Sequence, residues 1–213
     1  MNSLSLKKTL RKLVQHYPEA QCSLRFSSAW ELLVATILSA QCTDERVNKI
    51  TPGFFKKLPT VHTVAVARIA TIERLVRSAG FYKNKAKGIK GSAQRIVTTY
   101  NGQVPTTMDE LLTLPGVARK TANVVLGTAF HKACGIVVDT HVSRIVRRFG
   151  WTTHANPQKI EQDLMRLLPQ KEWILFSHRL IRHGRTLCKA PTPVCSQCFL
   201  AQNCPKIGVK NKK

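Results

Sequence analysis

Apolar residues recur at helical spacing along most of this 213-residue chain. Leu, Ile, Val and Phe repeatedly stand three or four positions apart, which places them on one face of an α-helix. No alternating apolar and polar run is long enough to predict a strand, and residues 136–138, Ile-Val-Val, are interpreted as a buried extended linker. The pattern therefore predicts an all-α fold.

The most apolar helix is expected to begin at a capping box formed by Ser28 and Glu31. It continues to Leu38 and is apolar nearly all round, so we expect it to be buried at the centre of the core. Further helices are expected around residues 45–58, 62–70, 72–78, 83–99, 108–114, 118–130, 141–149, 157–168 and 173–188. Breaks are expected at residues 52–53, 80, 101–102 and 150, where Pro, Gly and Asn favour turns.

Residues 1–17 form an amphipathic stretch with an apolar stripe of Leu4, Leu10, Leu13 and Val14. Such a helix can lie on a membrane surface, and the lack of an acidic residue before Glu19 is also typical of a mitochondrial transit segment. We favour a surface helix that packs its stripe on the core. No segment resembles a secretory signal or reaches transmembrane length, so no membrane partner is predicted.

Positive charge dominates the composition, with 34 Lys and Arg against 11 Asp and Glu and a formal net charge of +23. The 43% of apolar residues is enough to bury a core, which excludes a disordered protein. So strong a charge favours a polyanionic partner, and nucleic acid is the leading candidate. Lysine contacts with phosphates bring affinity without base preference, so the charge predicts no sequence specificity.

Four of the seven cysteines stand close together near the C-terminus, at Cys188, Cys195, Cys198 and Cys204. This C-x6-C-x2-C-x5-C spacing indicates a metal site. Structural zinc sites usually combine two short cysteine pairs, whereas four cysteines at varied spacings hold [4Fe–4S] clusters. The spacing therefore favours iron–sulfur, with zinc, and then cysteines without a metal, as the alternatives. The uneven cysteine distribution fits a reducing compartment. We expect a cytosolic protein, with an organelle or the nucleus as open alternatives.

Residues 114–126, LPGVARKTANVVL, predict two helices joined by a tight turn at Pro115 and Gly116. The start of the second helix would present backbone N–H groups and the positive end of its dipole to a phosphate. Lys120 lies in the first turn of that helix, where the dipole and partial burial in a cleft would disfavour its protonated form and leave a nucleophilic amine. Taken by itself, the segment favours simple phosphate contacts for Lys120 and Arg119.

Asp139 precedes another predicted helix, and it can serve as an N-cap or as a catalytic carboxylate. The two roles are compatible because the capping N–H groups favour the charged carboxylate. Such a group could take a proton from an attacking amine and stabilise positive charge on a sugar as its base leaves.

Five segments together resemble endonuclease III, in matching order across essentially the whole chain. They are residues 39–44 (SAQCTD), the LPGVARKTANVV hairpin, residues 138–141 (VDTH), residues 183–185 (HGR) and the cysteine tail. The resemblance implies a helix-hairpin-helix DNA glycosylase fold with its active site in the cleft between two domains. One is a six-helix barrel over residues 22–133, with the hairpin at about 108–127, and the other is an iron–sulfur cluster domain of residues 1–21 and 134–213.

The resemblance also implies a bifunctional DNA glycosylase and AP lyase of base excision repair. Lys120 would attack C1′ of an extruded, oxidised pyrimidine nucleotide, form a Schiff base and nick the abasic site by β-elimination, with the help of Asp139. The enzyme would be a monomer that carries a [4Fe–4S] cluster and binds double-stranded DNA with oxidised pyrimidines or abasic sites. Gln41 and Phe81 match the positions that the family inserts into the gap left by the nucleotide. Other DNA contacts are expected at Pro115, Gly116, Val117, Ala118, Arg119, His141 and Lys189.

Three features depart from the family pattern. Ala118 replaces a usual glycine and adds a methyl group where a phosphate would approach. Phe81 replaces a more usual aliphatic wedge, and residues 189–194 carry fewer cations than many cluster loops. We expect these changes to affect substrate range or turnover and to leave the chemistry intact.

Two other functions are open from the sequence. A mismatch adenine glycosylase shares the hairpin and the cysteine spacing, but it generally lacks the lysine at position 120, has a glutamate where residues 34–37 read VATI, and adds a C-terminal domain. A non-catalytic iron–sulfur DNA-binding protein would have no use for Lys120 and Asp139 together.

Overall fold

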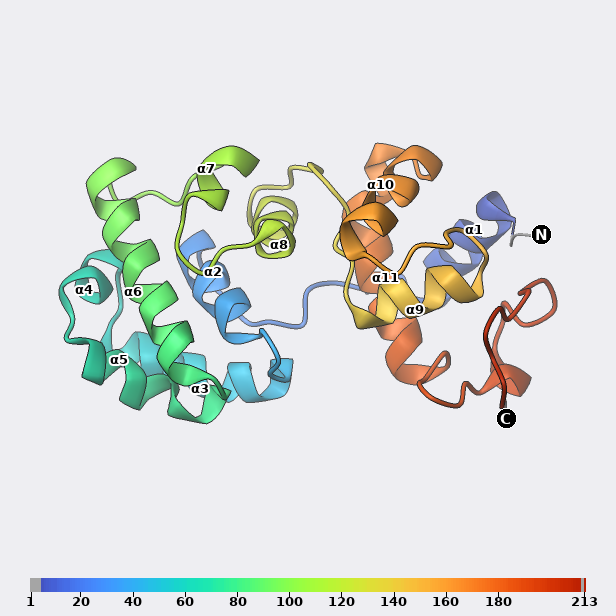
Figure 1. Ribbon diagram of the computed structural model, residues 1–213, viewed down its shortest axis with the longest axis horizontal. Helices are drawn as coiled ribbons and strands as arrows, with labels where there is room; N and C mark the ends of the chain where they lie inside the picture. The colour runs from blue at the N-terminus through green and yellow to red at the C-terminus, as the bar shows by residue number, and fades with distance from the viewer. Residues whose placement is uncertain (1–4, 212) are drawn as a thin grey trace. The chain divides into compact units, whose positions relative to one another are not determined.

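The computed structural model describes residues 5–211 and 213, and these residues form eleven α-helices, three short 3-10 helices and no strand (Figure 1). The predicted all-α fold is confirmed. The chain divides into two compact units. We call Cys22–Cys134 the central unit, and the described part of Met1–Gln21 together with Gly135–Lys213 the terminal unit. Leu4 of the predicted apolar stripe lies outside the described residues.

Helix α2 (Ala29–Leu38) is the buried centre of the central unit, as predicted. Trp30 and every residue from Leu32 to Leu38 are buried. The Ser28 side chain accepts the N–H of Glu31, and the Glu31 carboxylate in turn accepts the N–H of Ser27 at 2.7 Å. The first bond satisfies an N–H group that the first turn of a helix leaves without a partner, and the second satisfies the N–H of the residue before the N-cap.

The other helices of the central unit are α3 (Asp44–Lys57), α4 (Val61–Val66), α5 (Ile69–Val76), η1 (Arg77–Ala79), α6 (Tyr82–Thr99), α7 (Met108–Leu112) and α8 (Arg119–Ala129). The helix predicted over residues 62–70 is wrong. Ala67 and Arg68 adopt extended backbone angles and separate α4 from α5. No Gly or Pro marks this break, so the apolar pattern gave no sign of it.

The break predicted at residues 52–53 is also wrong, because α3 continues through Pro52 and Gly53. Proline removes one helical hydrogen bond and strains the preceding turn. The helix continues because it packs Val47, Ile50 and Phe54 into the core on both sides of the proline. The predicted turns at Gly80, Gly102 and Gly150 are confirmed, with φ values of 64°, 76° and 73°.

The turn between α7 and α8 lies directly against the backbone of α6. A Cβ built on Gly116, which has a φ of 80°, would lie 3.1 Å from the Cα of Gly88. The Ser92 hydroxyl donates a hydrogen bond of 2.7 Å to the carbonyl of Pro115. The hairpin is therefore fixed on α6 by a backbone contact that only glycines allow and by a buried hydroxyl.

The terminal unit contains α1 (Leu6–His16), α9 (Thr140–Arg148), α10 (Pro157–Leu167), η2 (Gln170–Glu172), α11 (Trp173–Thr186) and η3 (Cys195–Gln197). Its core includes Leu13 of α1, which is fully buried, so α1 packs on the core as we favoured. Val14 does not share this burial, because it is 40% exposed. It follows Leu13 directly and so points about 100° away around the helix. No helix within the described residues has the length and apolar character needed to cross a membrane.

Substituting Gly53 with alanine should stabilise the central unit. Gly53 is in a helix interior, and an added Cβ would have no atom within 4 Å. Alanine restricts the unfolded chain and favours a helix by about 0.5–1 kcal/mol. Urea unfolding monitored by circular dichroism is expected to show a higher midpoint for Gly53→Ala.

Gly116→Ala is the matching control with the opposite sign. Its left-handed φ and the short distance to Gly88 are expected to lower the midpoint. A lower unfolding midpoint for Gly53→Ala would contradict this prediction, since it would show that the free space around the added Cβ does not determine the effect of the substitution.

Candidate functional site

The hairpin turn presents backbone and side chains of mixed exposure. Pro115, Gly116 and Ala118 are exposed, whereas Val117 is buried and its N–H donates to the carbonyl of Leu114. Ala118 is the N-cap of α8, and it supplies no side-chain cap to the first turn. Its φ of −99° and ψ of 169° are ordinary extended angles, so the backbone at this position does not require glycine.

Lys120 lies in the first turn of α8, as predicted, but its side chain is exposed. The expected partial burial of Lys120 is therefore wrong for the chain without DNA. Arg119, its neighbour, is half-buried.

Asp139 caps α9, as the sequence indicated. Its Oδ1 atom accepts the N–H of Val142 at 2.8 Å, and the carboxyl group is half-buried. His141, in the first turn of α9, has its Nδ1 atom 3.2 Å from the guanidinium of Arg144. Burial lowers the pKa of His141, and the nearby Asp139 opposes this effect. An arginine can only donate, so the Nδ1 of His141 acts as the acceptor.

Two arginines of α9 bind the loop that carries the first cysteine. Arg144 donates to the carbonyl of Cys188 at 2.9 Å. Arg148 is buried and donates to the carbonyls of Lys189 at 2.9 Å and Pro191 at 3.3 Å, and to the sulfur of Cys188 at 3.2 Å. The helix that begins at Asp139 is thereby fixed to the cysteine loop by charged hydrogen bonds.

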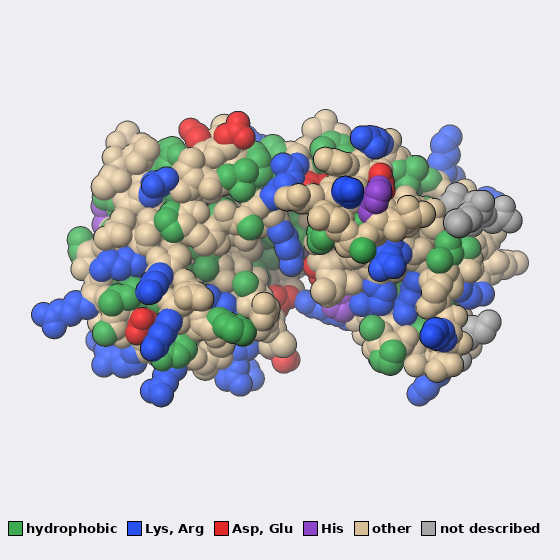
Figure 2. All heavy atoms as spheres, viewed as in Figure 1, with side chains coloured by type: hydrophobic (Ala, Val, Ile, Leu, Met, Phe, Trp, Pro, Cys, Tyr) green, Lys and Arg blue, Asp and Glu red, His purple; other side chains and the backbone are tan. Residues whose placement is uncertain are grey.

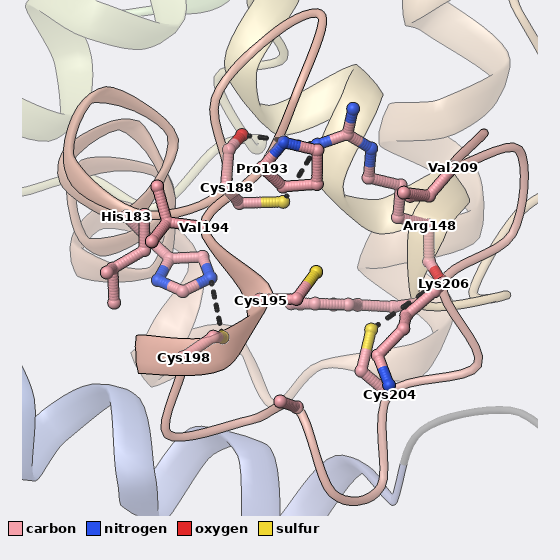
Figure 3. A pocket seen from close by; sticks show the side chains of 13 residues that line it. Arg148, His183, Cys188, Pro193, Val194, Cys195, Cys198, Cys204, Lys206 and Val209 are labelled. Carbon is pink, nitrogen blue, oxygen red and sulfur yellow. Dashed lines mark hydrogen bonds between the residues drawn. The ribbon is translucent and has the colours of Figure 1, made fainter. Parts of the chain in front are cut away.

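Figure 3 shows Cys188, Cys195, Cys198 and Cys204 around one space, with Arg148 and His183 beside them. This space opens partly to solvent. His183 is buried, and its two ring nitrogens lie 3.1 Å from the Tyr17 hydroxyl and 3.8 Å from the sulfur of Cys198. The four cysteines of the predicted metal site are thus brought together at the wall of one pocket.

Burial, with the neighbouring cysteines adding to it, raises the pKa of Cys198 to about 11 and also raises the pKa of Cys204. Burial lowers the pKa of His183 to about 4. Four thiols in such a place become thiolates when a cation compensates their charge, which is the behaviour of metal ligands.

None of the seven cysteines, all of which are described, forms a disulfide. Among the described residues, no three His, Cys, Asp or Glu are grouped closely enough to hold a metal ion.

The two predicted wedge residues share an unusual backbone conformation. Gln41 and Phe81 are exposed and have positive φ values of 52° and 46°. Phe81 retains 68% of its accessible surface, which is high for a large aromatic side chain. Lys85 is buried and donates to the carbonyls of Leu38 and Ala79, and sequence reasoning missed it as it missed Arg144 and Arg148. A lysine or arginine in a highly basic chain carries no mark that separates an internal cation from a surface one.

Lys and Arg side chains are spread over the visible face of the molecule, with Asp and Glu at few places (Figure 2). Lys189 is exposed in the loop that follows Cys188. This distribution fits contact with a polyanion over a wide surface.

Known proteins that resemble this chain are DNA repair proteins. The HhH-GPD superfamily of base excision DNA repair proteins matches residues 34–170, which include the hairpin and Asp139. Endonuclease III of Synechocystis sp. is 53% identical over 196 residues, covering 92% of this chain and 88% of that protein. Endonuclease III of Escherichia coli K12 is 35% identical over 204 residues, and the match covers 96% of each chain.

Solved structures of endonuclease III also match this chain. A non-covalent endonuclease III–DNA complex matches with a TM-score of 0.89 and 41% identity over 94% of both chains. A trapped endonuclease III–DNA covalent intermediate matches with a TM-score of 0.89 and 40% identity, covering 95% of this chain and 97% of that one. This chain belongs to the endonuclease III family. The mismatch adenine glycosylase and the non-catalytic DNA-binding protein are accordingly not favoured.

Arg148→Lys should loosen the cysteine loop although it keeps the charge. A single ammonium cannot reproduce the planar set of donors that reaches Cys188, Lys189 and Pro191. Losing buried charged hydrogen bonds is expected to cost about 1.5–3 kcal/mol in the free energy of unfolding. Urea unfolding gives this energy, and amide hydrogen exchange over residues 188–194 should become faster.

Arg147→Lys is the matched control, since Arg147 is the exposed neighbour in the same turn of α9. It is expected to change neither measurement appreciably. Equal effects of the two substitutions would mean that the contacts of Arg148 do not stabilise the loop.

Proposed function

We propose that this base excision repair glycosylase and AP lyase removes oxidised pyrimidines from duplex DNA, with Lys120 as its nucleophile. The observation that carries the proposal is the position of Lys120. It is an exposed amine in the first turn of α8, directly after a turn that is fixed on α6 and open to a phosphate backbone. A phosphate contact alone would not require the amine that a Schiff base needs.

The chemistry follows from the amine. Its nitrogen bonds to C1′ of the extruded nucleotide as the C1′–N bond to the base breaks, and the base leaves with a proton. Opening of the sugar ring gives an imine to Lys120. Loss of a proton from C2′ then expels the 3′ phosphate by β-elimination, and water releases the enzyme. Because Lys120 is exposed in the free chain, we infer that the bound nucleotide excludes water from the reacting amine.

Asp139 is proposed to assist Lys120 on the same nucleotide. One carboxylate oxygen is held by the Val142 N–H as the N-cap of α9, so the group has a fixed direction. A fixed carboxylate can accept the proton that the attacking amine loses and stabilise positive charge on the sugar.

DNA is proposed to be held through the hairpin and distorted by two wedges. The hairpin would bind phosphates through backbone N–H groups at the start of α8, which positions the duplex without reading bases. Gln41 and Phe81 would fill the gap left by the extruded nucleotide, and extrusion costs least for damaged bases that stack and pair poorly. Further contacts are proposed at Pro115, Gly116, Val117, Ala118, Arg119, His141 and Lys189.

We propose that Cys188, Cys195, Cys198 and Cys204 hold a [4Fe–4S] cluster. The residues fit the group, since four cysteines line one pocket and Arg148 donates to one of the sulfurs. When bound, the cluster supplies iron–thiolate bonds that fix the loop of residues 188–204. Arg148 also offsets part of the negative charge that four thiolates bring.

Lys120→Arg and Lys120→Gln should both fail to form a covalent product. Sodium borohydride reduces a Schiff base to a stable bond, so the wild-type chain should be trapped on duplex DNA with an abasic site and neither variant should be. Lys120→Arg keeps a charge for phosphates and is expected to bind the duplex about as well as the wild type. Trapping and nicking by Lys120→Arg would show that Lys120 is only a phosphate contact.

Asp139→Asn should slow catalysis while the fold is kept. Asparagine caps helices about as well as aspartate, so the unfolding midpoint is expected to change little. The single-turnover rate of base release should fall by about 10²- to 10⁴-fold, because the amide cannot accept a proton. A rate within threefold of wild type would remove Asp139 from the proposed mechanism.

Cys198→Ser should abolish or severely reduce iron binding. Elemental analysis of the purified wild-type chain is expected to give about four irons and little zinc. Cys134→Ser changes an exposed cysteine of the central unit and serves as the control that retains full iron content. Stoichiometric zinc in the wild-type chain, or full iron in Cys198→Ser, contradicts the proposed cluster.

A further inference from the structure

Four exposed residues of the central unit that are not glycine have positive φ values, and the two proposed wedges are among them: Gln41, Phe81, Asn101 and His131. Gln41 and Phe81 both have left-handed backbone angles without being glycine. Such a backbone costs free energy, and it persists only where the surrounding structure determines it. Both residues follow the C-terminal end of a helix, Gln41 three residues after Leu38 of α2 and Phe81 two residues after Ala79 of η1.

One buried ammonium joins these two helix ends. The Nζ atom of Lys85 donates to the carbonyl of Leu38 at 2.9 Å and to the carbonyl of Ala79 at 2.6 Å. Lys85 is only 6% exposed. The last carbonyls of a helix lack partners within it and form the negative end of its dipole, so they are suitable ligands for a buried cation.

The backbone of Lys85 completes the arrangement. Its N–H and that of Asn84 both donate to the carbonyl of Phe81, which is the N-cap of α6. Lys85 therefore binds the chain on each side of Gly80, through its side chain at Ala79 and through its backbone at Phe81. The same side chain binds the end of α2, from which the Gln41 segment begins.

The site is an unfavourable one for a cation in other respects. Burial lowers the pKa of Lys85, and its place in the first turn of α6 puts the ammonium near the positive end of that helix dipole. A leucine or methionine would fill the same space without this cost. The two carbonyl bonds are what a lysine adds at this position.

We propose that Lys85 is a positioning residue for nucleotide extrusion, which fixes the Gln41 and Phe81 segments relative to each other so that both wedges are formed before DNA binds. This inference rests on the proposed function of the two wedges. Preformed wedges lower the barrier to extrusion because their ordering is completed during folding and not at the moment of reaction. Lys85 itself touches neither the DNA nor the reacting atoms.

Lys85→Met tests the proposal because methionine fills a similar length and donates no hydrogen bond. Borohydride trapping is measured under single turnover on a duplex with one abasic site and on the same strand without its complement. The duplex requires extrusion and the single strand does not. We expect a loss of at least about tenfold on the duplex and less than about threefold on the single strand.

Ile96→Ala is the matched control. Ile96 is fully buried in the same helix, eleven residues from Lys85. Its truncation should destabilise the central unit without touching either wedge segment, and it should reduce trapping on the two substrates equally. If Lys85→Met also reduces both rates equally, the residue is merely structural and the proposal is overturned. If the wild-type chain is not trapped on either substrate, the proposed function fails instead.

A double-mutant cycle gives a second, independent test. In a chain that already carries Gln41→Ala and Phe81→Ala, adding Lys85→Met should change the duplex rate by less than about threefold, because no wedge is left to position. A loss as large as in the wild-type background contradicts the proposal.

Should Lys85→Met not fold, Lys85→Arg serves as a second variant. Arginine keeps the charge in a rigid planar group, and it is expected to show a smaller loss of trapping that is confined to the duplex. If Lys85→Arg reduced trapping on the duplex and on the single strand by the same factor relative to wild type, the proposal would be overturned.

Discussion

The contact between Gly116 and Gly88 is the constraint on which the proposed active site depends. The backbone of the hairpin turn lies so close to α6 that neither position has room for a Cβ without displacement. Close packing makes this contact a fixed reference, since protein interiors yield little to compression. The direction of α8, and with it the position of Lys120, follows from that contact and from the Ser92 bond to Pro115.

The terminal unit uses a different kind of constraint. Its cysteine loop packs Leu200 and Phe199 into the core, and hydrogen bonds from Arg144 and Arg148 of α9 hold the part that follows Cys188. Because α9 also begins at Asp139, one rigid helix connects the proposed catalytic carboxylate to the proposed cluster loop. A change in the loop would therefore be transmitted to the carboxylate through nine residues of helix.

Much of the fold could be predicted because its signals are local. The cap at Ser28, the glycine turns and the N-cap at Asp139 each depend on residues adjacent in sequence. The break after Val66 and the continuous helix through Pro52 depend on packing between distant segments, which periodicity does not report. For the same reason the exposure of Lys120 differed from expectation, since burial is a property of the assembled surface.

The net charge has a second function that composition alone conceals. Lys85 and Arg148 are buried, and the bonds described for them go to backbone carbonyls and one sulfur and not to carboxylates. With only 11 acidic residues in the chain, carbonyls at helix ends and in loops become the ligands for internal cations. Some of the 34 basic residues therefore stabilise the segments that would meet DNA, while the exposed majority supplies the attraction to it. A substitution that removes positive charge will weaken DNA binding at the surface, whereas at these internal positions it will first change the shape that binds.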